Sequence, residues 1–168
     1  MEEHLITAVT IDEKEVKITL RDVPDKPGVA ARIFAGIAQR NINVDMIIQN
    51  ISHQPPATSH QKPKTDLSFT IQKGDLEEAL DEIKKIAKKI GAGGVDYDED
   101  IAKVSVVGVG MRSHPGVAAK MFSALAEQKI NIGMISTSEI KISCIVKKRD
   151  GKKAVRAIHR KFGLERGK

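Results

Sequence analysis

Aromatic residues and cysteines are nearly missing from this chain of 168 residues. Tryptophan is absent, aromatic residues make up 3% of the chain, and Cys144 is the single cysteine. One cysteine excludes an internal disulfide and a zinc cluster built on several thiolates, and it fits a reducing compartment. Hydrophobic residues still make up 40%, so we expect a core of aliphatic side chains, with Cys144 as a small member of it.

The chain also lacks long apolar runs and nucleotide-binding loops. No stretch approaches the ~20 apolar residues of a membrane-spanning helix, and the N-terminal MEEH is too acidic for a signal peptide. No GxxxxGK[ST] loop occurs, and the Gly108–Gly110 segment has Ser113 where a dinucleotide fingerprint needs glycine. The five histidines have no metal-ligand spacing. We therefore expect a soluble cytoplasmic protein without membrane contact, cofactor, metal or catalytic centre in this chain.

A basic excess is the clearest feature of the composition. The formal net charge is +6, the calculated isoelectric point is about 9.4, and many of the cations follow residue 146. This balance suggests an acidic partner. Three interpretations of the basic residues stay open: a solvated helix face, a docking surface for another subunit, or a binding surface for nucleic acid.

An internal repeat organises the sequence. The segment PGVAA at 27–31 recurs at 115–119, an offset of 88 residues (116 minus 28), and Phe34, Ala38 and Met46 meet identical residues at the same offset. The chain therefore holds two copies of one unit.

The first copy predicts the strand and helix order βαββαβ, the ferredoxin-like layout of an α+β fold. A helix opens at Pro27 and Gly28, with Asp25 as a plausible N-cap, and a second helix follows Asp75. The expected strands are 16–21, 44–51, 67–72 and 94–97, and the proline-containing segment 52–64 is expected to be a loop.

The second copy predicts the strands 102–109, 131–136 and 140–147 with helices at 116–128 and 151–162, and the chain then ends without a fourth strand. A surplus strand at 5–11 precedes the first copy. We expect this strand to complete the second sheet, because an unpaired edge is unfavourable. The predicted domains are therefore residues 14–98 and residues 4–12 plus 99–168, with the first inserted in the second.

Two groups of motifs resemble a known family. The segment DKPGVAA at 25–31, followed by INVDMIIQN at 42–50, resembles the first ACT domain of aspartate kinases. The segment SHPGVA at 113–118, followed by ISTSEIK at 135–141, resembles the second. The resemblance extends over about residues 5–162, and STSEI at 136–140 is its most specific part.

The resemblance implies the regulatory part of an aspartate kinase, active in feedback control of amino-acid biosynthesis. The family's kinase domain, which phosphorylates L-aspartate with ATP, carries a Lys-Phe-Gly-Gly segment that does not occur here. The chain on its own is therefore expected not to be an enzyme. A separate β subunit and a part of a longer enzyme both fit. The implied partners are threonine, with lysine as a second candidate, a second copy of the chain, and a catalytic aspartate kinase subunit or domain.

The resemblance also places the effector sites. Threonine would lie between the first ACT domain of one chain and the second of its partner. The corresponding residues here are Asp25, Gly28, Val29, Ala30 and Gln49, with Asn131 and Ile132 from the other chain. Physical reasoning supports the first group, because a helix N-terminus receives a carboxylate and an acidic side chain holds an ammonium group. Read alone, Pro-Gly could equally be a helix start and Asn131 a turn residue.

For lysine, the candidates are Asp45, Gly116, Ser136 and Glu139, because an ammonium group requires a carboxylate. Solvated surface charges at Asp45 and Glu139 are the competing interpretation.

Two other functions compete. A freestanding ACT sensor of another enzyme is disfavoured by the STSEI segment. An RNA-recognition module is disfavoured because Phe69 and Tyr97 are the only aromatic residues on the four strands expected in the first copy, whereas such modules stack bases on sheet aromatics.

Overall fold

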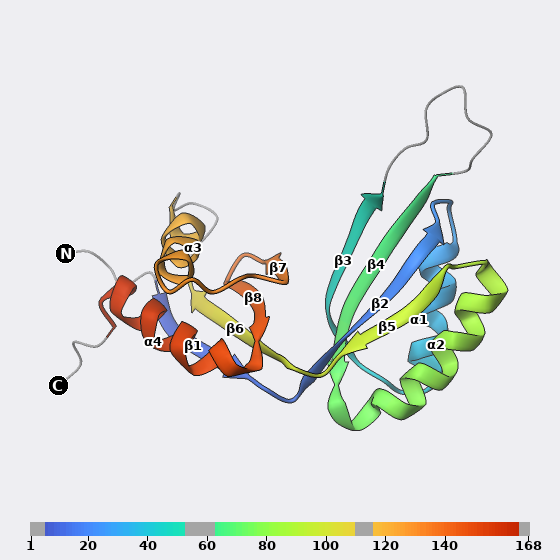
Figure 1. Cartoon of the computed structure of the whole chain (residues 1–168), viewed down its shortest axis with the longest axis horizontal. Coiled ribbons are helices and arrows are strands. Elements are labelled where there is room, and N and C mark those ends of the chain that lie inside the picture. Colours follow the sequence, from blue (N-terminus) through green and yellow to red (C-terminus); the bar gives the residue numbers. More distant parts are fainter. Residues whose placement is uncertain (1–5, 53–62, 110–115, 165–168) are drawn as a thin grey trace. The chain divides into compact units, whose positions relative to one another are not determined.

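A computed structural model describes residues 6–52, 63–109 and 116–164. The chain divides into two compact units, residues 15–99 and residues 1–14 with 100–168 (Figure 1). Each unit has one four-stranded sheet whose paired strands are all antiparallel. The predicted α+β class with two ferredoxin-like repeats is confirmed.

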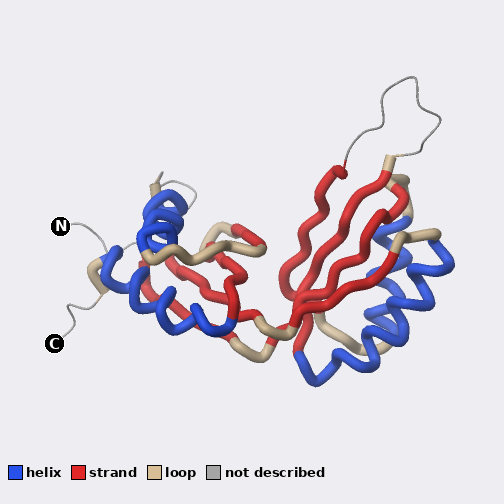
Figure 2. The backbone as a smooth tube through the Cα atoms, in the orientation of Figure 1, coloured by secondary structure: helices blue, strands red, loops and turns tan. Residues whose placement is uncertain are grey.

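The unit 15–99 has the order βαββαβ and a sheet ordered β3-β4-β2-β5. Its two helices lie together on one face of that sheet (Figure 2). The elements are β2 (Glu15–Pro24), α1 (Val29–Gln39), β3 (Val44–Ser52), β4 (Lys64–Gln72), α2 (Leu76–Ile90) and β5 (Gly94–Asp98), with a short 3₁₀ turn, η1 (Lys73–Asp75), before α2.

The second unit has a sheet ordered β1-β6-β8-β7. Its N-terminal strand pairs antiparallel with β6, from Ile6 opposite Gly108 to Asp12 opposite Lys103. The fourth strand of this sheet is thus supplied from before the first repeat. The elements are β1 (Ile6–Asp12), β6 (Ile101–Gly108), α3 (Val117–Glu127), β7 (Met134–Thr137), β8 (Lys141–Lys147) and α4 (Gly151–Phe162), with the 3₁₀ turn η3 (Lys148–Asp150) before α4.

Aliphatic alternation explains both cores. In β2, the side chains of Val16, Ile18 and Leu20 are fully buried because alternate residues face the helices. Phe69 lies in the same core, with its ring edge-on to Phe34 at a centroid distance of 5.5 Å. Cys144 is fully buried in the other core, as expected.

Several element ends differ from the prediction. Helix α1 begins at Val29, and its N-cap is Gly28, without a side-chain cap hydrogen bond, so the N-cap role expected of Asp25 is wrong. Strand β2 continues to Pro24 through a register shift after Leu20. Strand β7 begins at Met134, because pairing with β8 starts opposite Ile145. Most of the expected loop at 52–64 lies outside the described residues.

Among the described helices, none is long and apolar enough to cross a lipid bilayer.

Candidate functional site

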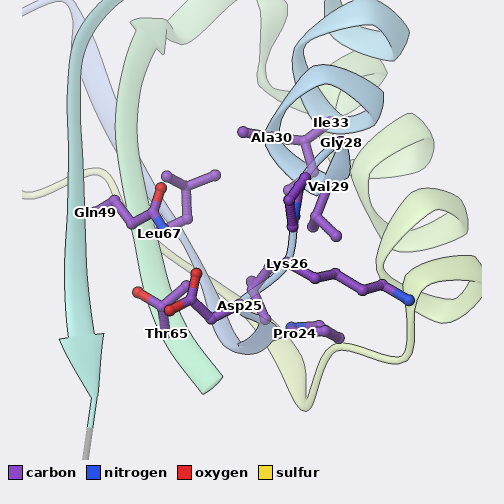
Figure 3. Close-up of a pocket in the computed structure, with 12 residues that line it drawn as sticks. Pro24, Asp25, Lys26, Gly28, Val29, Ala30, Ile33, Gln49, Thr65 and Leu67 are labelled. Carbon is purple, nitrogen blue, oxygen red and sulfur yellow. The ribbon is translucent and has the colours of Figure 1, made fainter. Parts of the chain in front are cut away.

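A pocket of about 340 Å³ opens where β2, α1, β3 and β4 meet (Figure 3). Its floor is apolar and comes from the buried side chains of Val29, Ile33 and Leu67. Pockets for small ligands begin at about 300 Å³. The space therefore suits a molecule of the size of a free amino acid.

The turn from β2 to α1 forms one wall. The N–H of Asp25 donates to the carbonyl of Pro63 at 3.0 Å, and the N–H of Lys26 donates to the carbonyl of Pro24 at 3.0 Å. Gly28 then takes φ 89° and ψ −13°, in the left-handed region. A Cβ on Gly28 would meet no heavy atom within 4 Å, so glycine is needed here for its backbone conformation and not for space.

The first turn of α1 presents backbone donors to this pocket. The N–H of Arg32 bonds to the carbonyl of Gly28 at 3.1 Å, and N–H groups ahead of it have no i−4 carbonyl in the helix. The N–H of Val29 donates a hydrogen bond to the carbonyl of Lys26 at 3.4 Å. No acidic side chain lies in the first turn to offset the partial positive charge of the helix. A carboxylate is the chemical group that suits such a position.

Polar side chains from three segments complete the pocket. Figure 3 shows Asp25 from the turn, Gln49 from β3 and Thr65 from β4 around the space in front of the helix start. Gln49 is exposed and pairs with Leu67 in the β3–β4 ladder. The hydroxyl of Thr65 is buried and donates to the carbonyl of Asn50, so it ties β4 to the edge strand β3 that carries Gln49. Lys26 extends away from Gln49.

Five of the predicted threonine residues line this one pocket: Asp25, Gly28, Val29, Ala30 and Gln49. Asn131 and Ile132 belong to the other unit, in the connection between α3 and β7. Asn131 is exposed, whereas Ile132 is half-buried against the core of that unit.

The predicted lysine residues are divided between the units. Asp45 is exposed on β3, whereas Gly116 is the N-cap of α3, Ser136 lies in β7, and Glu139 is exposed between β7 and β8. Gly116 takes φ 101°, so the left-handed turn of Gly28 recurs at its repeat position. Asp45 belongs to the unit 15–99, whereas the other three belong to the second unit, so no single unit contains all four.

More than half of the residues that line the pocket are not predicted from the sequence. Thr65 falls outside the predicted strand because the polar residues Lys64 to Asp66 give no apolar alternation. Val23 and Pro24 are missed because the predicted strand ends at Arg21. The remaining unpredicted lining residues are Lys26, Pro27, Ile33 and Leu67.

The thiol of Cys144 lies in the core of the second unit. Burial raises the pKa of the Cys144 thiol to about 12, which keeps it protonated. No three His, Cys, Asp or Glu side chains of residues 6–52, 63–109 and 116–164 lie together as a metal site requires.

Comparison with known proteins assigns both repeats to one domain family. An ACT domain model matches residues 18–88, and a second ACT domain model matches residues 104–162.

The similar proteins are aspartokinases. The chain is 47% identical over 165 residues to the aspartokinase of Pseudomonas aeruginosa, of which it spans 38% of the length. A solved structure of aspartokinase alpha and beta subunits contains a chain that is 45% identical; the match covers 95% of our chain and 99% of that one, with a TM-score of 0.84. The ligand-free regulatory subunit of aspartate kinase from Thermus thermophilus is 40% identical, with 94% and 99% covered and a TM-score of 0.85. With this identity over nearly the whole of a regulatory subunit, the chain belongs to the family of aspartokinase regulatory regions built from two ACT domains.

Proposed function

We propose that this chain binds free L-threonine in the pocket at Gly28 and thereby inhibits an aspartate kinase. The observation that carries the proposal is the meeting of an uncapped helix N-terminus, a carboxylate and a carboxamide around one small space. This set matches the three polar groups of threonine.

Each group has a complementary partner. The backbone N–H of Ala30 receives the ligand carboxylate, together with that of Val29, which exchanges its long bond to the carbonyl of Lys26 for the ligand. Asp25 holds the ammonium group, in a charge-assisted hydrogen bond. Gln49 both donates and accepts, as a hydroxyl requires. The apolar floor at Ile33 and Leu67 takes the methyl group.

A second copy of the chain completes the site in this proposal. Asn131 and Ile132 of that copy close the pocket, and the exposure of Asn131 leaves it able to do so. A ligand held by two chains binds the assembled dimer better than other arrangements, so it shifts the population toward that dimer. A coupling of about 1–3 kcal/mol between effector and substrate sites would then change affinity by about 5–150-fold.

The target of the inhibition is a catalytic aspartate kinase subunit or domain, which phosphorylates L-aspartate with ATP. The similarity to structures and sequences of aspartokinases supports this partner. Lysine is the candidate for a second effector, at Asp45, Gly116, Ser136 and Glu139, with residues from two chains contributing.

Calorimetric titration of the purified chain with threonine tests the main proposal. The Asp25→Ala variant should bind threonine about 10–100-fold more weakly, because a hydrogen bond between charged groups contributes about 1.5–3 kcal/mol. Glu77→Ala is the matched control, since Glu77 is an exposed carboxylate on α2 outside the pocket. Unchanged threonine affinity in Asp25→Ala would refute the site, and an absence of threonine binding by the unaltered chain would refute the function.

Lysine, methionine and isoleucine are titrated in parallel, with the mass of the chain measured in solution. We expect lysine to bind in addition to threonine, and threonine to favour the dimer. Loss of lysine binding in Asp45→Asn, with threonine binding retained, would support the separate lysine site; retained lysine binding would count against it.

A further inference from the structure

The exposed face of α4 differs in charge from that of its repeat partner α2. The two helices are equivalent, because each follows a 3₁₀ turn and their residues correspond at an offset of 75 (148 minus 73). Ala79 and Ile83 of α2 correspond to Ala154 and Ile158 of α4, and all four are fully buried. The buried faces of the two helices are therefore alike.

The exposed faces carry different charges. On α2, the exposed positions 77, 81 and 85 hold Glu, Asp and Lys, and Asp81 forms an ion pair with Lys85 at 3.3 Å. The equivalent positions of α4 hold Lys152, Arg156 and Arg160, which are also exposed. Lys148 in η3 precedes this series by four residues, and its equivalent Lys73 in η1 is also basic. We call Lys148, Lys152, Arg156 and Arg160 the basic ridge.

Four-residue spacing places Lys152, Arg156 and Arg160 on one side of α4, with about 6 Å of rise between neighbours and about 12 Å from first to last, and Lys148 precedes them in the 3₁₀ turn. Like charges at this spacing destabilise a helix, whereas opposite charges stabilise it. On α2 the pair Asp81–Lys85 is stabilising, whereas on α4 both neighbouring pairs among Lys152, Arg156 and Arg160 are repulsive. Arg160 is favourable in the last turn of α4, so helix stability leaves Lys152 and Arg156 unexplained.

The basic ridge has no acidic partner within the described residues. None of its four members forms an ion pair there. The neighbouring Lys161 differs, because it binds Glu127 of α3, and Lys153 donates to the carbonyl of Gln128. Lys153 and Lys161 thus make polar contacts within the unit, whereas the cations of the basic ridge are exposed to solvent.

We propose that the basic ridge is a docking surface for an acidic protein surface. This proposal goes beyond the threonine site and does not depend on it. The ridge presents a linear row of positive charge, and its complement is a row of carboxylates. Because Lys152, Arg156 and Arg160 project from a helix that packs on the core, the backbone positions of these cations are set without ligand.

Two other anionic partners fit less well. The described aromatic residues of this unit, Phe122 and Phe162, lie on helices and pack against the core, so its sheet has no ring on which nucleic acid bases could stack. On α4, Ala154, Ala157 and Ile158 are buried, and Val155 and Phe162 are half-buried against the core, so no fully exposed apolar side chain is available to enter a lipid surface.

The test uses a short fluorescent poly-L-glutamate peptide as the acidic probe, and its binding to the full chain is measured by anisotropy. The ridge variant Lys152→Glu/Arg156→Asp gives α4 the charge pattern of α2, because the carboxylate introduced at position 156 can pair with Arg160 and preserve the helix. The control Lys84→Glu/Lys89→Glu makes the same change in net charge at exposed positions of α2.

We expect the ridge variant to bind the peptide at least about tenfold more weakly and the control to lose less than about threefold, since screened charges away from a contact matter little. Equal weakening in both variants would overturn the proposal, because net charge alone would then explain binding. Tighter, ridge-dependent binding of a single-stranded RNA of equal charge, or of anionic vesicles, would overturn the choice of a protein partner. Should the ridge variant fail to fold by circular dichroism, Lys152→Gln/Arg156→Gln replaces it, Lys84→Gln/Lys89→Gln becomes the charge-matched control, and the same outcomes apply.

Discussion

At the scale of single residues, Cys144 has an environment that controls its chemistry. Its side chain is fully buried in the core of the second unit, and burial raises the pKa of the thiol from 9.0 to about 12. A raised pKa in the folded state means that the contribution of the neutral thiol to stability is complete below about pH 9 and declines as the pH rises toward 12.

The native thiol should accordingly react at least about a hundredfold more slowly with Ellman's reagent at pH 8 than the thiol of the unfolded chain, because both access and thiolate are lost on folding. Stopped-flow absorbance in buffer and in guanidinium chloride makes the comparison. Equal rates would show that Cys144 is not buried.

At the scale of elements, the start of α4 is packed more tightly than the start of α2. A Cβ on Gly151 would lie 2.9 Å from the Cβ of Ala102 in β6 and 2.7 Å from Ile11 Cδ1 in β1. The methyl of Ala102 cannot rotate away, so the backbones of α4 and β6 would have to separate.

Gly151→Ala should therefore lower the free energy of unfolding by about 1–3 kcal/mol through overpacking. Gly74→Ala is the matched control in η1, where a Cβ would meet nothing within 4 Å, and it should change stability by no more than about 0.5 kcal/mol. Urea unfolding measures both. A Gly151→Ala variant as stable as the unaltered chain would contradict the close packing of α4 on β6.

At the scale of the whole molecule, the two ends of the first repeat are neighbours. Lys17 of β2 pairs with Asp98 of β5, and antiparallel partners have Cα atoms about 4.5–5.5 Å apart. The repeat also has its own core, which includes Ile18, Ile33 and Phe69. These are the properties of an inserted domain.

Residues 15–99 expressed alone should consequently fold, with a cooperative urea transition and a dispersed amide spectrum. The segment 100–168 without residues 1–14 is the control: it lacks β1, which leaves β6 with an unpaired edge, and it should aggregate or remain unfolded. If 15–99 remained unfolded in isolation, the division into inserted and interrupted domains would be wrong.

The repeat makes most of this architecture predictable from the sequence. Once Gly28 and Gly116 are aligned, the surplus N-terminal strand and the missing last strand point to the same sheet. The residues proposed around Gly28 follow from the resemblance to aspartate kinases, because Pro-Gly read alone marks only a helix start. Thr65 could not be predicted as a lining residue from the sequence. Lys64–Asp66 form a strand only through pairing with β2 and β3, a tertiary effect without a local signal. Asp22 likewise takes φ 51° at the register shift of β2, where its N–H binds the carboxylate of Asp66.

The central claim is that the turn at Gly28 receives a free amino acid, and backbone amide NMR tests it most directly. Threonine is titrated into the ¹⁵N-labelled chain while the amides of Gly28, Val29 and Ala30 are followed, with Gly74 as a distant reference. We expect saturable shifts at the three pocket amides at one common affinity and none at Gly74. Unmoved pocket amides at saturating threonine, or shifts confined to Gly116 and Val117 of the other repeat, would contradict it.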